Sequence, residues 1–166
     1  MRPIASALNQ LRAAVRAQIL SAAAKKAPKG SELSIAQVLK TTPGVFKENA
    51  KNVVIKDLKR GNTRAGFPGV KAVAKDVFSK PGTRGRSHKC SIVAMDGKPV
   101  YLSKAAYFSC DCEAFLYWCE VALHAKGAAA IKFSNGEAPD TRNPRKLPMI
   151  CKHLIELAYT CREHKF

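Results

Sequence analysis

Two short pairs of metal-binding residue types occur in the second half of the sequence. Cys110 and Cys112 lie in SCDCEAFLYWC, and Cys151 and His153 lie in MICKHLIEL. Thiolates and imidazoles are the ligands that zinc prefers in structural sites, where four of them surround the ion as a tetrahedron. An iron–sulfur cluster also fits this ligand set, because histidine replaces cysteine in some clusters. The two pairs therefore predict one metal site, with zinc favoured and a cluster as the alternative.

The local structure expected around each pair allows both of its members to reach one ion. Residues i and i+2 of an extended segment point to the same side, so Cys110 and Cys112 can share a target. Cys151 and His153 fall near the start of the last predicted helix, where the longer imidazole can compensate for their angular separation. A helix N-terminus also favours the thiolate form of cysteine.

Three further cysteines, Cys90, Cys119 and Cys161, test this assignment. On one helix Cys119 would lie about 10 Å from Cys112, and Cys161 would lie about 15 Å from the cysteine at the start of the last helix. One ion cannot bind residues so far apart. We therefore expect all three in the core as small hydrophobic residues, although a hairpin could bring Cys90 close to the metal site. Without a secretory signal, a disulfide framework is disfavoured.

The elements that position the two pairs can be predicted from turn and cap residues. Two β-prone runs flank Asp96 and Gly97, which is a strong hairpin signal. The segment EAFLYWCEVALHAKG then predicts a helix, with Asp111 at its N-cap and Gly127 at its C-cap. A long polar loop with three prolines follows. The last helix is predicted over residues 149–163.

The order hairpin, C-x-C, helix, C-x-H and helix resembles the SWIM zinc finger. The residues that match its motif are Cys110, Cys112, Cys151 and His153. The gap between the two pairs is longer than SWIM fingers usually have, which is a departure from the family. The resemblance implies a single structural metal ion and a role in binding DNA or proteins.

A second resemblance concerns residues 88–160. The pattern SNG…P…NPR…CKH is similar to one found in small proteins of tailed bacteriophages, some of which are structural components of the virion. The matching residues that precede the C-x-H pair are Ser134, Asn135, Gly136, Pro139, Asn143, Pro144 and Arg145. The resemblance implies a tail, baseplate or neck protein located in the virion or the host cytoplasm, and it says little about residues 1–80.

The first half is predicted to be helical. Apolar residues at helical spacing predict an amphipathic helix over residues 3–25. Ser34 can cap a short helix, a second one is expected over residues 43–51, and Pro68 can open a third over residues 68–80. The periodicity of NVVIKDL does not decide between strand and helix.

These elements together predict an α+β fold. Residues 1–87 form a helical, basic region. Residues 88–166 form a metal-binding domain, in which a β-hairpin and helix module is held by the metal and closed by the C-terminal helix.

The chain carries a net charge of +17, and the excess is concentrated in its first half. Residues 1–90 hold 19 lysines and arginines against 4 acidic residues. Such a surface suits a polyanionic partner, either nucleic acid or an acidic protein, whereas the simpler interpretation is a solvated lysine-rich surface. The candidate contacts lie in the basic segment KPGTRGRSHK and are Lys80, Arg84, Arg86 and Lys89.

The N-terminal segment is rich in arginine and alanine and has no acidic residue before Glu32. This composition resembles a mitochondrial transit peptide, which gives the mitochondrion as an alternative location. A plain amphipathic helix is the favoured interpretation. No apolar run of about 18 residues is present, so no membrane partner is expected.

The sequence features bear on three functional classes: an enzyme, a structural assembly protein and a nucleic-acid-binding protein. A catalytic zinc keeps one position open for water, whereas the four predicted ligands close the site, so neither an enzyme nor a small-molecule substrate is expected. The favoured function is a structural protein docked on other subunits of a larger assembly. The alternative is a nucleic-acid-binding zinc-finger protein. Few aromatic residues and no recognition helix are evident, so its binding would be non-specific and directed at the phosphate backbone.

Overall fold

The computed structural model describes residues 31–77, 85–132, 134–137 and 141–166. The helix predicted over residues 3–25 lies outside them. The described part has an α+β fold built on one four-stranded antiparallel sheet, in which the strands follow one another in sequence order. The strands are β1 (Val53–Asn62), β2 (Pro68–Asp76), β3 (Ser87–Ala94) and β4 (Ala106–Cys110).

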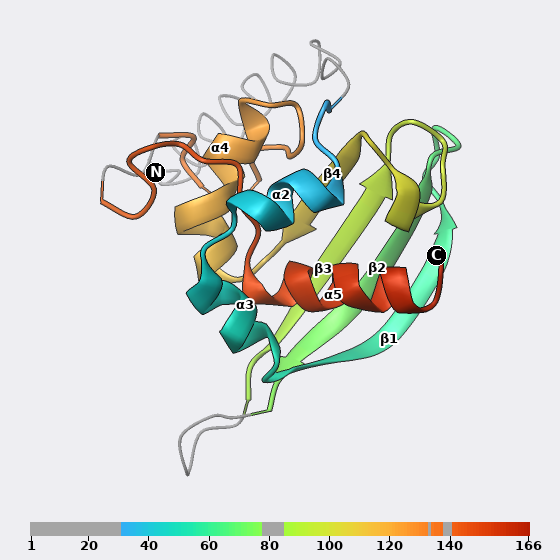
Figure 1. Cartoon of the computed structure of the whole chain (residues 1–166), viewed down its shortest axis with the longest axis horizontal. Helices are drawn as coiled ribbons and strands as arrows, with labels where there is room; N and C mark the ends of the chain where they lie inside the picture. The colour runs from blue at the N-terminus through green and yellow to red at the C-terminus, as the bar shows by residue number, and fades with distance from the viewer. Residues whose placement is uncertain (1–30, 78–84, 133, 138–140) are drawn as a thin grey trace, which may run out of the picture.

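The described helices are α2 (Ile35–Thr41), α3 (Gly44–Ala50), α4 (Glu120–His124) and α5 (Lys152–Glu163). Figure 1 shows α5 crossing one face of the sheet, with α2 and α3 on the same side, and α5 contacts all four strands. The core lies between this face and the helices. None of the described helices has both the length and the apolar character needed to span a membrane.

The helix predicted over residues 68–80 is wrong, because residues 68–76 form strand β2, which pairs with both β1 and β3. Val70 and Ala72 are buried, whereas Lys71 between them is exposed. Burial of every second residue is the pattern expected for a strand in a sheet that is covered on one face. Pro68 stands at the first position of the strand, which proline tolerates.

The two predicted regions, residues 1–87 and 88–166, both contribute strands to this one sheet. That boundary falls inside β3, and β2 before it is hydrogen-bonded to β3 along its length. The segment NVVIKDL, whose conformation the sequence left open, belongs to β1. Asp57 adopts a positive φ of 49° at a break in the β1–β2 register between Lys56 and Lys59.

The predicted hairpin at Asp96 and Gly97 is present, but its second strand comes later than expected. Residues 100–102 form a 3-10 turn, and the strand that pairs with β3 is β4. The Asp96 carboxylate accepts hydrogen bonds from Ser103 Oγ at 2.8 Å and from the Lys104 backbone N–H at 2.9 Å. These bonds stabilise a longer connection than a two-residue turn.

The predicted helix after β4 is also present, with a different N-cap. Asp111 does not cap it, because its carboxylate accepts a hydrogen bond from the Lys89 backbone N–H at 3.0 Å. Cys112 takes that role instead, as its Sγ accepts the Phe115 N–H at 3.3 Å. A π-helical segment (Phe115–Cys119) precedes α4, and Gly127 follows the helix with a φ of 67°, as a C-terminal glycine should.

The short helices before the sheet hold the segment that leads into α5. The α2 N-terminus has the predicted Ser34 cap, completed as a capping box by Gln37. At its other end, the buried Thr42 hydroxyl donates to Val38 O at 2.7 Å and accepts the Ile150 N–H at 3.1 Å. Thr41 Oγ1 donates to Pro148 O. These bonds position Cys151, which follows directly.

Replacing Thr42 with valine should therefore destabilise the fold. The change keeps the side-chain shape but leaves the buried Ile150 N–H without its acceptor, which costs about 1 to 3 kcal/mol. Urea unfolding followed by circular dichroism measures the loss. Thr160→Val is the control, because among the described residues the Thr160 hydroxyl donates to Glu156 O within its own helix. Equal stabilities of the two variants would contradict the role given to Thr42.

Candidate metal centre

The fold brings the two predicted pairs together at the meeting point of β4 and α5. Cys110 is the last residue of β4, and Cys112 lies two residues later, just before the following helix. Cys151 is the extended N-cap residue of α5, and His153 is the second residue of that helix. All four are buried and form a group that could hold a metal ion.

The separations within this group suit a single ion. The three Sγ atoms and one imidazole nitrogen all lie within 4.8 Å of one another, and Cys110 Sγ is 3.9 Å from His153 Nδ1. Ligand atoms of a tetrahedral zinc site with metal–sulfur bonds of about 2.3 Å lie about 3.8 Å apart. The donor atoms therefore lie at most about 1 Å further apart than they would around a bound zinc ion.

The pKa values of the three thiols are shifted in different directions. Hydrogen bonds from the Cys110 and Cys151 thiols lower the pKa of Cys112 far below its usual range. The hydrogen bond to Cys112 raises the pKa of Cys110, and burial raises the pKa of Cys151. One thiolate is thus stabilised by two neighbouring thiols. A bound cation would replace those protons and deprotonate the coordinating thiols.

Two helix N-termini favour negative charge at this position. Cys112 and Cys151 both occupy the residue before the first turn of a helix, where unpaired backbone N–H groups and the helix dipole stabilise a thiolate. The extended conformation of Cys151 also explains how Cys151 and His153 can bind the same ion. Because Cys151 lies outside the helix, its thiol and the His153 ring can face the same point.

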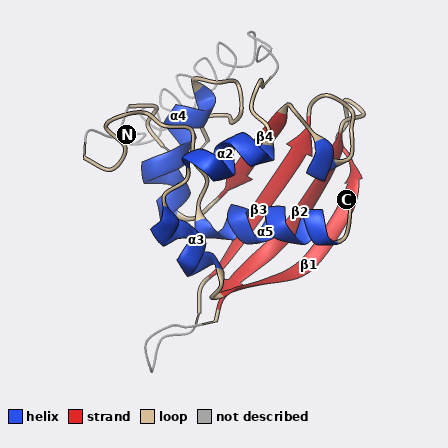
Figure 2. Ribbon diagram, viewed as in Figure 1, coloured by secondary structure: helices blue, strands red, loops and turns tan. Residues whose placement is uncertain are grey.

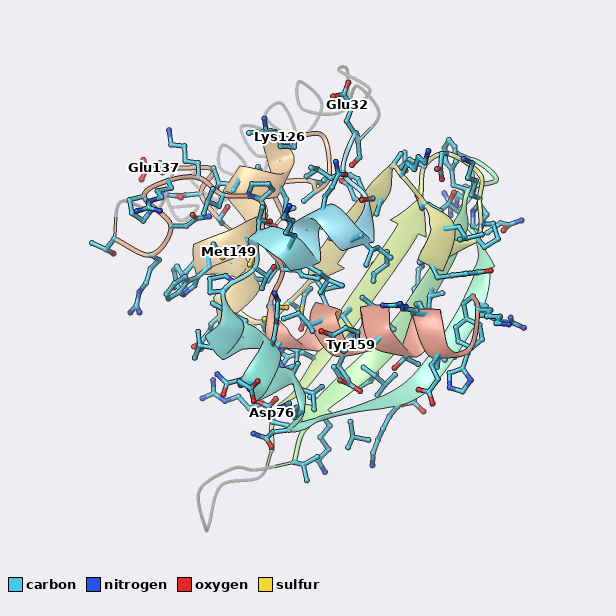
Figure 3. The ribbon with its side chains drawn as sticks, in the orientation of Figure 1. Glu32, Asp76, Lys126, Glu137, Met149 and Tyr159 are labelled. Atoms are coloured by element: carbon cyan, nitrogen blue, oxygen red, sulfur yellow. The ribbon has the colours of Figure 1, made fainter. Side chains whose placement is uncertain are left out.

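Asp76, at the end of β2, orients the imidazole and was missed by the sequence analysis. His153 Nε2 lies 3.1 Å from Asp76 Oδ1, so the ring can donate there and direct Nδ1 at the thiols. Lys152 Nζ lies 2.9 Å from Asp76 Oδ2. Burial opposes ionisation of Asp76, but hydrogen bonds from Lys152 and His153 outweigh it and hold its pKa below the usual value. Figure 3 labels Asp76 at the lower end of the sheet.

A carboxylate behind a histidine ligand is a common feature of metal sites, because it fixes the tautomer and strengthens the ligand. His88 adds a second constraint on the ring. The centroids of the His88 and His153 rings are 4.6 Å apart, and His88 Nδ1 lies 3.2 Å from Asp111 Oδ1. Asp111, expected to be a helix cap, thus supports the residue that packs on His153.

The other three cysteines belong to the core, as predicted. Cys90, Cys119 and Cys161 are buried and lie outside the metal-binding group. Cys90 does pair with Cys110 across the sheet, but its thiol donates to Ala72 O instead. Burial raises the pKa of Cys90 and of Cys161 to about 12, so both remain protonated at neutral pH.

The predicted polyanion contacts are only partly described. Lys80 and Arg84 lie outside the described residues. Arg86 is exposed and lies 3.2 Å from the exposed Glu113 carboxylate. Lys89 is exposed on β3, and its backbone N–H is bonded to Asp111.

Comparison of the chain with protein-family models, with curated proteins and with solved structures finds no match. The side chains themselves are therefore the basis for inferring function.

Cys151→Ala should remove the metal and destabilise the fold. The variant loses one of four ligands, and where a metal completes a small fold its binding energy is folding energy. We expect metal content to fall from one equivalent to near zero, and the free energy of unfolding to fall by several kcal/mol, as measured by elemental analysis and urea unfolding. Cys161→Ala, which alters a buried cysteine outside the group, should keep the metal and cost about 1 kcal/mol. A Cys151→Ala protein that retains full metal content would refute the assignment.

Asp76→Asn should weaken metal binding without abolishing it. The amide is close in shape to the carboxylate but lacks the charge that fixes the His153 tautomer, and such losses typically reduce metal affinity about 10- to 100-fold. Competition with a chromophoric chelator measures the affinity. Asp96→Asn removes the same charge in the β3–β4 connection and should leave the affinity unchanged. Equal affinities for both variants would show that Asp76 does not support the site.

Proposed function

We propose that this chain is a non-enzymatic structural protein of a larger assembly. Its C-terminal part is held by one structural metal ion, and its basic half docks on a polyanionic neighbour. The observation that carries the proposal is the closed set of four ligands, Cys110, Cys112, Cys151 and His153, none of which is more than 3% exposed.

The closed ligand set argues against catalysis at the metal. Catalytic zinc sites use three protein ligands and leave the fourth position to water or substrate. Here four protein donors converge, and their burial denies solvent a path to the ion. No step of a reaction could therefore begin at this metal without the loss of a protein ligand.

Zinc is the ion we assign to the site. Four donor atoms within 4.8 Å of one another fit around a single ion, whereas an iron–sulfur cluster places several atoms between its ligands and spreads them further apart. Three thiolates and one imidazole are a common structural zinc set. The cluster remains the alternative that elemental analysis would detect.

The position of the site explains what the ion would stabilise. Its ligands come from the end of β4, the start of the next helix and the start of α5, and Asp76 adds the end of β2. One ion would thus join segments far apart in the sequence. Small domains use a metal in this way when the apolar core alone is too small to hold the fold.

The docking role rests on charge and on the two resemblances. The 19 basic residues against 4 acidic ones in residues 1–90 exceed what solubility requires, which favours an anionic neighbour. The C-x-C and C-x-H order resembles SWIM fingers, and the SNG…NPR…CKH pattern is similar to virion proteins of tailed bacteriophages. We therefore propose that the protein is located in a virion, at the tail, baseplate or neck, or in the host cytoplasm.

Cobalt substitution tests the central claim. Co²⁺ in place of the native ion should give the intense visible bands of tetrahedral thiolate coordination, unchanged by added imidazole or cyanide, because no coordination position is free. His153→Gly is the control: it leaves three thiolates and an open position, so its spectrum should respond to imidazole. A response of the unmodified protein would show an open site and overturn the structural role.

A further inference from the structure

The sheet has a second face that the described helices do not cover. In Figure 2, α2, α3 and α5 lie together on one side of the strands. Along β2, Val70, Ala72 and Ala74 are buried on that side. The alternate residues must point the other way, because successive side chains of a strand face opposite sides. The residue between Val70 and Ala72, Lys71, is exposed.

Cross-strand pairing places a group of lysines on this open face. Directly paired residues of antiparallel strands point to the same side. Val73 pairs with Lys56 on β1 and with Lys89 on β3, while Lys71, two residues before it, pairs with Lys59. Lys75 lies two residues beyond Val73. We call this group the lysine face: Lys56, Lys59, Lys71, Lys75 and Lys89.

The charges of the lysine face are not neutralised within the described structure. None of the ion pairs among the described residues includes any of the five. The paired positions of this face carry no aspartate or glutamate. The neighbouring Asp111 carboxylate is already bonded to the Lys89 N–H and to His88. Like charges opposite one another destabilise a sheet, as at Lys59 and Lys71, so an anionic partner would relieve a repulsion that the fold leaves in place.

The size of the lysine face suits an extended polyanion. Lys71 and Lys75 are separated by about 13 Å along β2, and β1 and β3 lie about 10 Å apart across it. A DNA duplex carries one charge per about 1.7 Å of its axis, so a stretch as long as this face presents about eight phosphates. Several lysines could therefore contact phosphates at the same time.

The side chains of this face favour nucleic acid over an acidic protein. Lysine is depleted in protein–protein interfaces, which depend on buried aromatic and arginine anchors. Between the lysines, the paired positions of the open face carry mainly serine, glycine and valine, and the aromatic residue among these described positions, Tyr107, is half-buried. Flexible ammonium groups and small hydroxyls are typical phosphate contacts. A second copy of the chain would meet this face with the same positive charge.

We propose that the lysine face binds the phosphate backbone of nucleic acid, without reading its sequence. The proposal rests on the polyanion docking in the proposed function, and it names both the surface and the partner. The contacts predicted from the sequence lay mainly in the segment around Lys80 and Arg84, whereas the proposed contacts lie on the sheet. Of the predicted residues, only Lys89 belongs to the lysine face.

A comparison of two charge-matched variants tests the proposal. Lys56, Lys71 and Lys89 are changed together to glutamine in the first variant. The control changes Lys98, Lys104 and Lys126, which are exposed outside the strands. Binding of a fluorescent DNA duplex is measured by anisotropy from about 50 to 200 mM salt. Each lost phosphate contact reduces the salt slope by about 0.9, so the first variant should lose about 2.7 in slope and bind at least tenfold more weakly at low salt. The control should stay close to the unmodified protein.

The possible outcomes distinguish nucleic-acid binding by the lysine face from the more general proposal of polyanion docking. Both variants must first show the circular dichroism and metal content of the unmodified protein; if the first triple fails to fold, single substitutions of the same lysines replace it, each expected to reduce the slope by about 0.9. Equal weakening in both triples would overturn the lysine face but keep polyanion docking. Binding to polyglutamate and not to DNA would overturn nucleic acid as the partner. Binding to neither polymer would overturn both proposals.

Discussion

Three thiols and an imidazole, buried within 4.8 Å of one another, impose the constraint on which the rest of the structure depends. Polar groups removed from water must find partners, and a thiolate without a cation is costly to bury. Residues from several elements of the fold provide these partners. Two helix N-termini point at the thiols, Asp76 fixes the imidazole, and Thr42 holds the segment before Cys151. Together these contacts connect the ends of β2 and β4 with the start of α5.

The sequence predicted the parts of this arrangement that depend on local chemistry. The spacing of the cysteines and histidine identified the group that converges, and Ser34 and Gly127 marked helix ends correctly. These features are set by side chains within a few residues of one another. The exclusion of Cys119 from the site followed in the same way, from the rise of a helix.

The sequence failed where long-range pairing decides the structure. The sequence predicts a helix for GVKAVAKD because Pro68 can open one. In the sheet, Val70 and Val73 lie on opposite faces, and Asp76 follows the buried alanines onto the inner face beside His153. The alternation of Lys71, Ala72, Val73, Ala74 and Lys75 was a sign of a strand. Its importance could be recognised only with β1 and β3 in place as neighbours.

The separation of the ligands along the chain also has a kinetic consequence. Cys110 and Cys112 are separated from Cys151 and His153 by a helix and a long polar segment, and Asp76 comes from a strand before them both. Contacts between such distant residues form slowly, because the intervening chain must first be ordered. Local turns and capped helices can form before the site closes. Until it does, the ligand thiols are not yet sheltered from solvent, so the folding chain passes through a stage in which oxidants compete with metal for their sulfur atoms.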